Sequence, residues 1–208
     1  MLDDLVRQRR SIRKYKPDPL PEAWIESMLR CAHQAPSPSN SQPVVFVRID
    51  SRHHRCNLHR ALADGHGRLI ARHKDENGSA RLRNRINAYR RYAEFMFTAP
   101  VLLAVGVRMG IEGFASRLAA AGLREEDGRQ ACDMDITVGL TLNGLLLKAQ
   151  ALGVGSCILT APLVFIEHVE SLLGLEKISI RSFVTLGLAD ETPSPPQKTP
   201  LSEAIKVI

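Results

Sequence analysis

The chain has 208 residues, of which 44% are hydrophobic and 24% charged, and it carries a formal net charge of +6 at pH 7. This length and composition are those of an ordinary soluble protein and favour a single domain with one core, residues 1–208. The positive charge would suit nucleic acid, an acidic membrane surface or a phosphate-bearing cofactor or substrate, and charge alone does not choose among them.

The distribution of apolar residues argues against membrane and secreted proteins. No apolar run reaches the roughly 20 residues that a membrane-spanning helix needs, and residues 1–15 lack the apolar core and cleavage site of a secretory signal. The four cysteines, Cys31, Cys56, Cys132 and Cys157, are far apart and form no C-x-x-C pair, which is typical of reduced core thiols. We therefore expect a cytoplasmic protein without a membrane segment.

The first quarter of the chain predicts two helices and a strand. Leu2, Leu5 and Val6 recur at helical spacing, so a short helix should run to about Arg9. A second helix should start near Pro21, because proline is favoured at the first helical position, and it should end before the prolines of the polar loop at 36–43. The apolar run 44–49 that follows is typical of a buried strand.

The middle of the chain alternates polar and apolar stretches. Residues 52–92 are rich in arginine and histidine and should be mostly helical, with breaks at Gly65, Gly67 and the DENGS turn at 75–79, and they should matter little to the core. Residues 101–107 predict a second strand, and residues 109–129 predict a helical or irregular excursion. Residues 131–152 predict a central helix that is apolar on nearly all sides.

The remainder predicts two strands and an extended arm. Residues 153–162 are typical of a glycine-entered strand, residues 163–173 of a short helix, and residues 182–189 of the last strand. The tail contains too many prolines to join a sheet before its end, so it should extend as an arm. Such an arm would most simply reach a second copy of the chain.

Four cations and a hydroxyl are concentrated in RRSIRKY, residues 9–15. Guanidinium groups bind phosphate oxygens through paired hydrogen bonds, and a serine adds a further donor. The segment therefore fits a phosphate site, and the alternative that these residues alone leave open is a solvated basic turn.

The order of motifs along the chain resembles that of the FMN-dependent nitroreductase family. The motifs are RRSIRKY, PSPSNSQP at 36–43, APVLLAV at 99–105, an apolar helix that leads into ALGVGSC at 151–157, and a lysine-containing C-terminal arm. The resemblance covers nearly the whole chain. It implies an α+β fold with a central mixed sheet flanked by helices, in a homodimer that exchanges its C-terminal arms.

The resemblance also implies FMN as the cofactor and NADH or NADPH as the reductant. Hydride would pass through flavin N5 to a nitroaromatic, quinone or related small acceptor in a ping-pong cycle. Arg13 would lie at the pyrimidine edge of the flavin, where a cation stabilises the reduced anion. The loop at 36–43 would reach the flavin from the other subunit, and the backbone N–H of Ala161 would face N5. The cofactor-binding residues implied in this way are Arg9, Arg10, Ser11, Arg13, Pro36, Ser37, Asn40, Ile158, Leu159, Thr160, Ala161 and Lys198.

Three features depart from the family pattern. The common Q-P-W is Q-P-V here and ends at Val44, and Thr160 stands where glycine or glutamate is common near N5. The polar or basic flavin contact expected before the A-P-V strand has no clear match, with Arg90 and Arg91 as the nearest candidates. These departures leave open a flavin-binding sensor or carrier that performs no turnover.

Two further interpretations concern charged residues of the middle segment. The five arginines and two tyrosines of residues 81–92 would also suit nucleic acid. A helix over the mouth of the active site is the favoured interpretation, so we expect no nucleic-acid partner. His59, His66 and His73 recur every seven residues, about 10 Å along a helix, which is too far for one metal ion, and we expect no metal.

Overall fold

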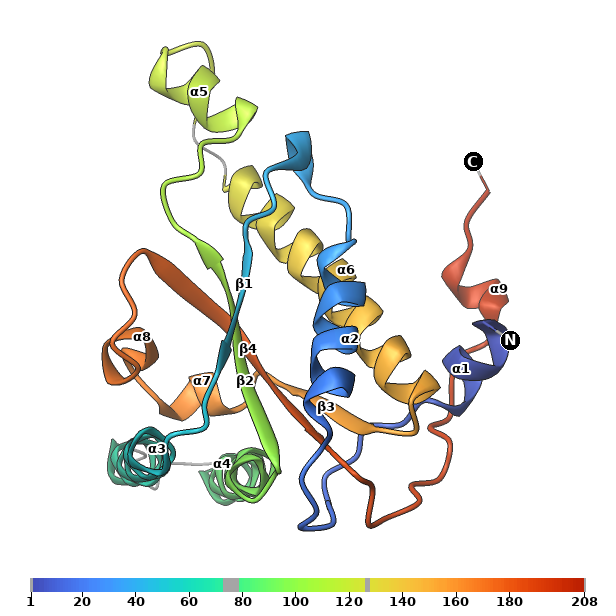
Figure 1. Cartoon of the computed structure of the whole chain (residues 1–208). Coiled ribbons are helices and arrows are strands. Elements are labelled where there is room, and N and C mark those ends of the chain that lie inside the picture. The colour runs from blue at the N-terminus through green and yellow to red at the C-terminus, as the bar shows by residue number, and fades with distance from the viewer. Residues whose placement is uncertain (1, 73–78, 126–127, 208) are drawn as a thin grey trace.

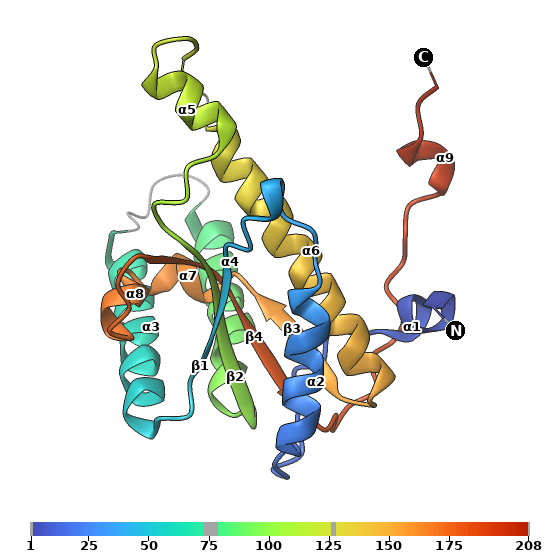
Figure 2. The ribbon, with the colours of Figure 1, turned by 45° about the horizontal axis from the view of Figure 1, so that its top comes forward.

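A four-stranded sheet forms the centre of the molecule, with helices on both faces (Figures 1 and 2). The computed structural model describes residues 2–72, 79–125 and 128–207. The strands lie in the order β1-β2-β4-β3. Their bounds are Val44–Arg48 for β1, Val101–Arg108 for β2, Gly155–Leu159 for β3 and Ile178–Gly187 for β4.

The expectation of a mixed sheet is wrong for these strands, because all three pairings are antiparallel. Helix α3 (Arg52–Arg72) leaves the end of β1, and helix α4 (Ser79–Glu94) brings the chain back to it, so β2 starts beside the end of β1 (Figure 2). Among the described residues, parallel pairing is confined to an isolated bridge between Ser11 and Ser156. The α+β class itself is confirmed.

One face of the sheet is covered by α2 (Glu22–His33) and α6 (Arg129–Ala151) (Figure 1). The apolar positions of α2 fall on one side, where Ile25 and Met28 are buried, as its spacing predicts. The expectation that α6 is central is wrong for a single chain, because one side of the helix is exposed. Its exposed side carries Ile136 and Leu140, whose exposed fractions are 62% and 45%.

The other face is covered by α3, α4 and two short helices, α7 (Pro162–Phe165) and α8 (Val169–Leu172). Residues 52–92 therefore matter to the core, contrary to expectation, because Leu58 and Leu62 of α3 are fully buried. The buried apolar residues of α3 form a narrow stripe within a polar sequence, so the sequence pattern does not reveal that this helix packs on the core. The predicted helix at 163–173 is divided, because His168 between its two parts has a left-handed backbone with φ 52°.

Neither predicted glycine break interrupts α3, which continues through Gly65 and Gly67. Gly65 is instead a packing position, since a Cβ built there would lie 1.8 Å from the carbonyl oxygen of Phe165. The predicted turn at 75–79 lies outside the described residues up to Gly78, and Ser79 begins α4.

Several elements extend from this body. Helix α5 (Phe114–Ala120) projects at one end of the molecule, and α1 (Leu2–Gln8) lies on the same side as the C-terminal arm with its short helix α9 (Leu201–Ala204) (Figures 1 and 2). Two 3₁₀ turns complete the order, η1 (Pro38–Asn40) and η2 (Phe95–Phe97). The arm follows β4 and is exposed along most of its length, as its prolines predict.

The four cysteines are free, but only Cys157 is buried, so the prediction of core thiols is wrong for Cys31, Cys56 and Cys132. No helix within the described ranges combines the length and the apolarity that crossing a membrane requires. The same ranges contain no group of three or more His, Cys, Asp or Glu side chains that could hold a metal ion.

Candidate functional site

The basic segment at 9–15 lies along the free edge of β3. The backbone N–H of Ile12 donates to the carbonyl oxygen of Ser156 at 3.0 Å, next to the bridge between Ser11 and Ser156. The hydroxyl of Tyr15 donates to the carbonyl oxygen of Ile12 at 2.5 Å and lies 2.7 Å from Oγ1 of Thr185 on β4. These contacts place the basic segment against the edge of the sheet.

A cavity of about 330 Å³ opens where the basic segment, the end of β3 and helix α4 meet. From the basic segment it is lined by Arg13, and from α4 by Tyr89 and Tyr92. The remaining wall is Cys157, Ile158, Leu159, Thr160 and Ala161. The structure thus brings together Arg13 and the 158–161 segment, as the sequence predicts.

The guanidinium of Arg13 has no ion-pair partner among the residues that the structure describes. Its guanidinium lies 5.7 Å from the centre of the Tyr92 ring, and one nitrogen is 3.4 Å from the carbonyl oxygen of Ser11. Glu191 accepts from the backbone N–H groups of Arg13 and Lys14, at 2.5 and 3.1 Å. No carboxylate in the described part of the chain forms an ion pair with this guanidinium, so it is available to an anionic ligand.

Cys157 lines this cavity, and its thiol has a raised pKa. Burial raises the pKa of Cys157, and this outweighs the opposing effects of the Arg13 and Arg9 charges and of a hydrogen bond with Ser11. Because the thiolate is the nucleophilic form, Cys157 is unsuited to nucleophilic catalysis. The charges of Arg9 and Arg13 and the hydroxyl of Ser11 thus all act on this one residue of β3.

The backbone after β3 offers a hydrogen-bond donor to the cavity. Ala161 lines the cavity, and its N–H finds no acceptor among the residues that the structure describes. A backbone donor that opens into a cavity can pair there with water or with a ligand. An unpaired donor beside an unpaired cation favours a ligand with acceptor atoms.

Arg10 is not part of this cavity. Its guanidinium donates to the carbonyl oxygens of Arg7 and Arg9, at 2.7 and 2.8 Å, and so binds the C-terminal end of α1. It lines a different cavity of about 410 Å³, together with the start of the arm. Within one chain, its position is that of a helix cap.

The polar loop at 36–43 lies over α6, away from the Arg13 cavity of the same chain. Its residues Ser39, Asn40 and Gln42 have left-handed backbones, with φ of 50°, 52° and 46°. Such a backbone is unfavourable for residues other than glycine, and here it is held by a bond from the N–H of Gln42 to Oγ of Ser37, 2.9 Å long. Pro36, Ser37 and Asn40 of this loop do not line the cavity in one chain.

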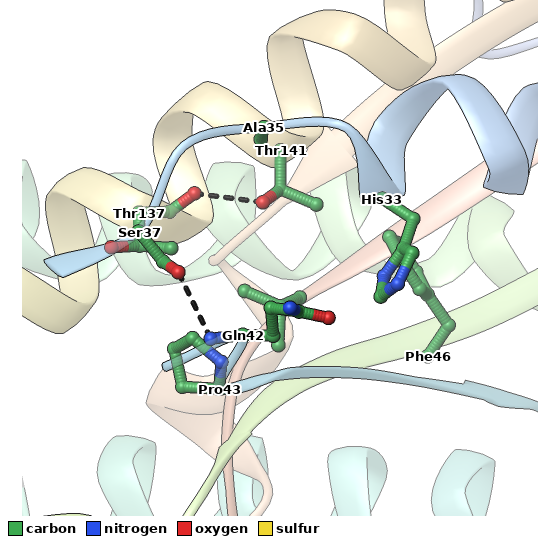
Figure 3. A pocket seen from close by; sticks show the side chains of 9 residues that line it. His33, Ala35, Ser37, Gln42, Pro43, Phe46, Thr137 and Thr141 are labelled. Carbon is green, nitrogen blue, oxygen red and sulfur yellow. Dashed lines mark hydrogen bonds between the residues drawn. The ribbon is translucent and has the colours of Figure 1, made fainter. Parts of the chain in front are cut away.

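A small cavity behind this loop is shown in Figure 3. Ser37 and the α6 residues Thr137 and Thr141 lie on one side of it, with His33 and Phe46 on the other. The hydroxyl of Thr141 donates to the carbonyl oxygen of Thr137 within α6 at 2.8 Å. A volume of about 20 Å³ has room for one water molecule, so the cavity is not a cofactor site.

Sequence reasoning missed Tyr89 and Tyr92, and it named Arg90 and Arg91 instead. Arg90 points away from the cavity and bonds His66 and Glu94, at 3.5 and 3.3 Å. The two tyrosines are three residues apart on α4 and therefore share a face. That spacing, just before an apolar strand, is the signal that could have identified them. Lys198 is exposed on the arm.

The chain is similar to known proteins of one family. The model of the nitroreductase family matches residues 6–188. YfhC of Bacillus subtilis, which is named as an NAD(P)H nitroreductase, is 24% identical over 98% of this chain and 92% of its own. A 5,6-dimethylbenzimidazole synthase of Rhodospirillum rubrum is 47% identical over 49 residues, which are 24% of this chain and 23% of that one.

Solved structures share the whole fold. A BluB-like flavoprotein of Clostridium difficile superposes with a TM-score of 0.84 at 23% identity, covering 100% of this chain and 99% of the other. The FMN-dependent nitroreductase NfnB of Mycobacterium smegmatis, in complex with NADPH, has a TM-score of 0.69 at 19% identity, covering 99% and 97%. The family model spans the basic segment, all four strands and every residue that lines the Arg13 cavity. This chain belongs to the nitroreductase family.

Proposed function

We propose that the protein is an FMN-dependent oxidoreductase that passes hydride from NADH or NADPH to a small acceptor such as a nitroaromatic or a quinone. The observation that carries the proposal is the Arg13 cavity, which is lined both by a guanidinium without an ion-pair partner among the described residues and by Ala161, whose N–H has no acceptor among them. Both are donors that an FMN ring, with its carbonyl and nitrogen acceptors, would satisfy. The chain therefore fits this cofactor.

FMN, when bound, supplies hydride transfer at N5, and the side chains mainly bind and orient it. Arg13 provides a positive charge that favours the reduced, anionic cofactor. Arg9 and Ser11 lie beside it and would bind the phosphate and ribityl chain. Ile158 and Thr160 line the cavity without a titratable group, so positioning of the two reactants rather than acid–base chemistry would supply the rate.

We further propose a homodimer in which each copy completes the other's site. Apolar residues remain exposed on three elements of one chain, namely Ile136 and Leu140 on α6, Leu2 and Val6 on α1, and Leu201, Ile205 and Val207 on the arm. Exposed apolar surface on this scale is typical of an interface. In such a dimer the loop residues Pro36, Ser37 and Asn40 and the arm residue Lys198 would reach the partner's cofactor.

The test is the visible spectrum of the purified full-length protein with added FMN, followed by steady-state oxidation of NADH and NADPH with a nitroaromatic and a quinone. We expect flavin bands that remain with the protein after gel filtration, and parallel double-reciprocal plots that indicate ping-pong kinetics. Arg13→Gln should lower kcat/KM by about 10- to 100-fold, since it removes the charge that favours the reduced cofactor. Protein that takes up no FMN would overturn the proposal.

The same samples separate two other functions. A flavin-binding sensor or carrier would hold FMN but would oxidise neither NADH nor NADPH with any acceptor. We consider this alternative because Thr160 and Val44 depart from the family pattern. The 47% identity of a 49-residue segment to a 5,6-dimethylbenzimidazole synthase favours a second catalytic candidate. Mass spectrometry of the reaction mixture would detect that product.

A further inference from the structure

Tyr92 and Arg13 come from distant parts of the chain and meet at the cavity. The guanidinium carbon of Arg13 lies 5.7 Å from the ring centre of Tyr92 on α4. A cation at this distance from an aromatic face is attracted by the ring's negative face. The contact joins the basic segment to α4 at the mouth of the cavity.

Arg13 needs such a contact because little else orients its side chain. The residue is exposed, and the 3.4 Å contact with the Ser11 carbonyl oxygen is long for a hydrogen bond. An arginine side chain loses considerable rotamer entropy when it is fixed. A neighbouring ring restricts it without neutralising its charge, whereas a carboxylate would neutralise it.

Helix α4 is a firm support for this ring. Near its C-terminal end, the Glu94 carboxylate lies 3.3 Å from His59 of α3, and also 3.3 Å from Arg90 of α4 itself. Asn87 on the same helix lies 2.8 Å from His66 of α3. Tyr92 lies between these two attachments along the helix.

We infer that Tyr92 is a positioning residue that holds the Arg13 guanidinium at the cavity, where it acts on the bound cofactor. The inference rests on the proposed function and adds a residue to it. Tyr92 acts through Arg13, so its removal should matter only while Arg13 is present. Tyr89 lines the same cavity and has nearly the same exposure, 53% against 57% for Tyr92, which makes it the matched control.

A double-mutant cycle tests this coupling. FMN affinity is measured by fluorescence titration of the full-length protein, and the flavin midpoint potential by equilibration with redox dyes, for Tyr92→Leu, Tyr92→Phe and Tyr89→Leu, each with and without Arg13→Gln. We expect Tyr92→Leu to weaken FMN binding by about two- to fivefold and to make the potential more negative, because exposed cation–π contacts are of this strength. Tyr92→Phe keeps the ring and should stay near wild type.

In the Arg13→Gln background, Tyr92→Leu should change neither quantity further, whereas Tyr89→Leu should have the same effect in both backgrounds. Equal effects of Tyr92→Leu in the two backgrounds, or equal coupling for Tyr89→Leu, would overturn the inference while leaving the proposed function intact. A wild-type protein that binds no FMN would overturn the proposed function, and the inference with it.

Discussion

At the scale of single residues, the Tyr15 hydroxyl fixes the basic segment to the sheet. Its partners are the Ile12 carbonyl oxygen and Oγ1 of the fully buried Thr185. Burial raises the pKa of Tyr15, and this outweighs the opposing hydrogen bond with Thr185. The phenol therefore stays neutral in the folded protein beyond the pH at which an unfolded tyrosine ionises.

We expect Tyr15→Phe to lower the free energy of unfolding by about 1–3 kcal/mol, since it leaves buried polar atoms without their partner. The raised pKa means that this stabilisation is complete below about pH 10 and is lost as the pH rises further. Urea denaturation from pH 7 to pH 11 would measure both effects. Tyr89→Phe, at an exposed site, should stay within about 0.5 kcal/mol of wild type, and an equal loss in the two variants would contradict the prediction.

At the scale of elements, the close packing of α3 against α7 requires a glycine, which has no side chain, at position 65. A Cβ at Gly65 would lie 1.8 Å from the Phe165 carbonyl oxygen, whereas a Cβ at Gly67 would meet nothing within 4 Å. Both glycines lie in the same helix, so they share any gain in helix propensity. The difference in the free energy of unfolding between alanine variants at the two positions therefore measures the packing of α3 against α7.

Gly65→Ala should lower the free energy of unfolding by about 1–3 kcal/mol, because the helices must move apart or strain. Gly67→Ala should raise it by about 0.5–1 kcal/mol, because alanine is the better helix former and the site is open. Thermal unfolding followed by circular dichroism would show whether each substitution raises or lowers the stability. Stabilisation by both substitutions would contradict the prediction, because it would mean that α7 can move away from a side chain at position 65 at little energetic cost.

At the scale of the whole molecule, the arm beyond Thr192 is expected to hold two copies together. Leu201, Ile205 and Val207 are 72%, 55% and 94% exposed in one chain. Each buried aliphatic side chain contributes about 1.5–3 kcal/mol, so an arm that packs on a partner would contribute strongly to dimer stability. The arm leaves the body as an extended segment that a partner could receive (Figure 2).

Removal of residues 193–208 should shift the protein toward monomers and weaken FMN binding, as judged by gel filtration with light scattering and by fluorescence titration. This truncation keeps Glu191 and its bonds to the backbone of Arg13 and Lys14. The matched variant Lys198→Ala keeps the arm and should remain dimeric. A truncated chain that is still fully dimeric at low micromolar concentration would assign dimerisation to the exposed apolar residues of α6 and α1.

The sequence predicts much of this molecule because its strongest signals are local. The helix ending near His33, the strand starting at Val44 and the long helix before Gly153 follow from apolar spacing and from proline and glycine stops. The role of Gly65 and the cavity position of Tyr92 depend on contacts with segments about 100 and 80 residues away along the chain. Local patterns carry no information about such partners. One side of α6 is apolar in sequence although it is exposed in one chain, which we attribute to the proposed dimer interface.

The bridge between Ser11 and Ser156 has a consequence for aggregation. β3 is the last strand of the sheet, and the free edge of such a strand can recruit another chain. The basic segment covers part of this edge through Ser11 and Ile12, so a ligand bound by Arg13 would also keep the edge covered. Loss of the ligand would remove this added support, so ligand-free protein should be the first to form insoluble material on heating, as light scattering would show.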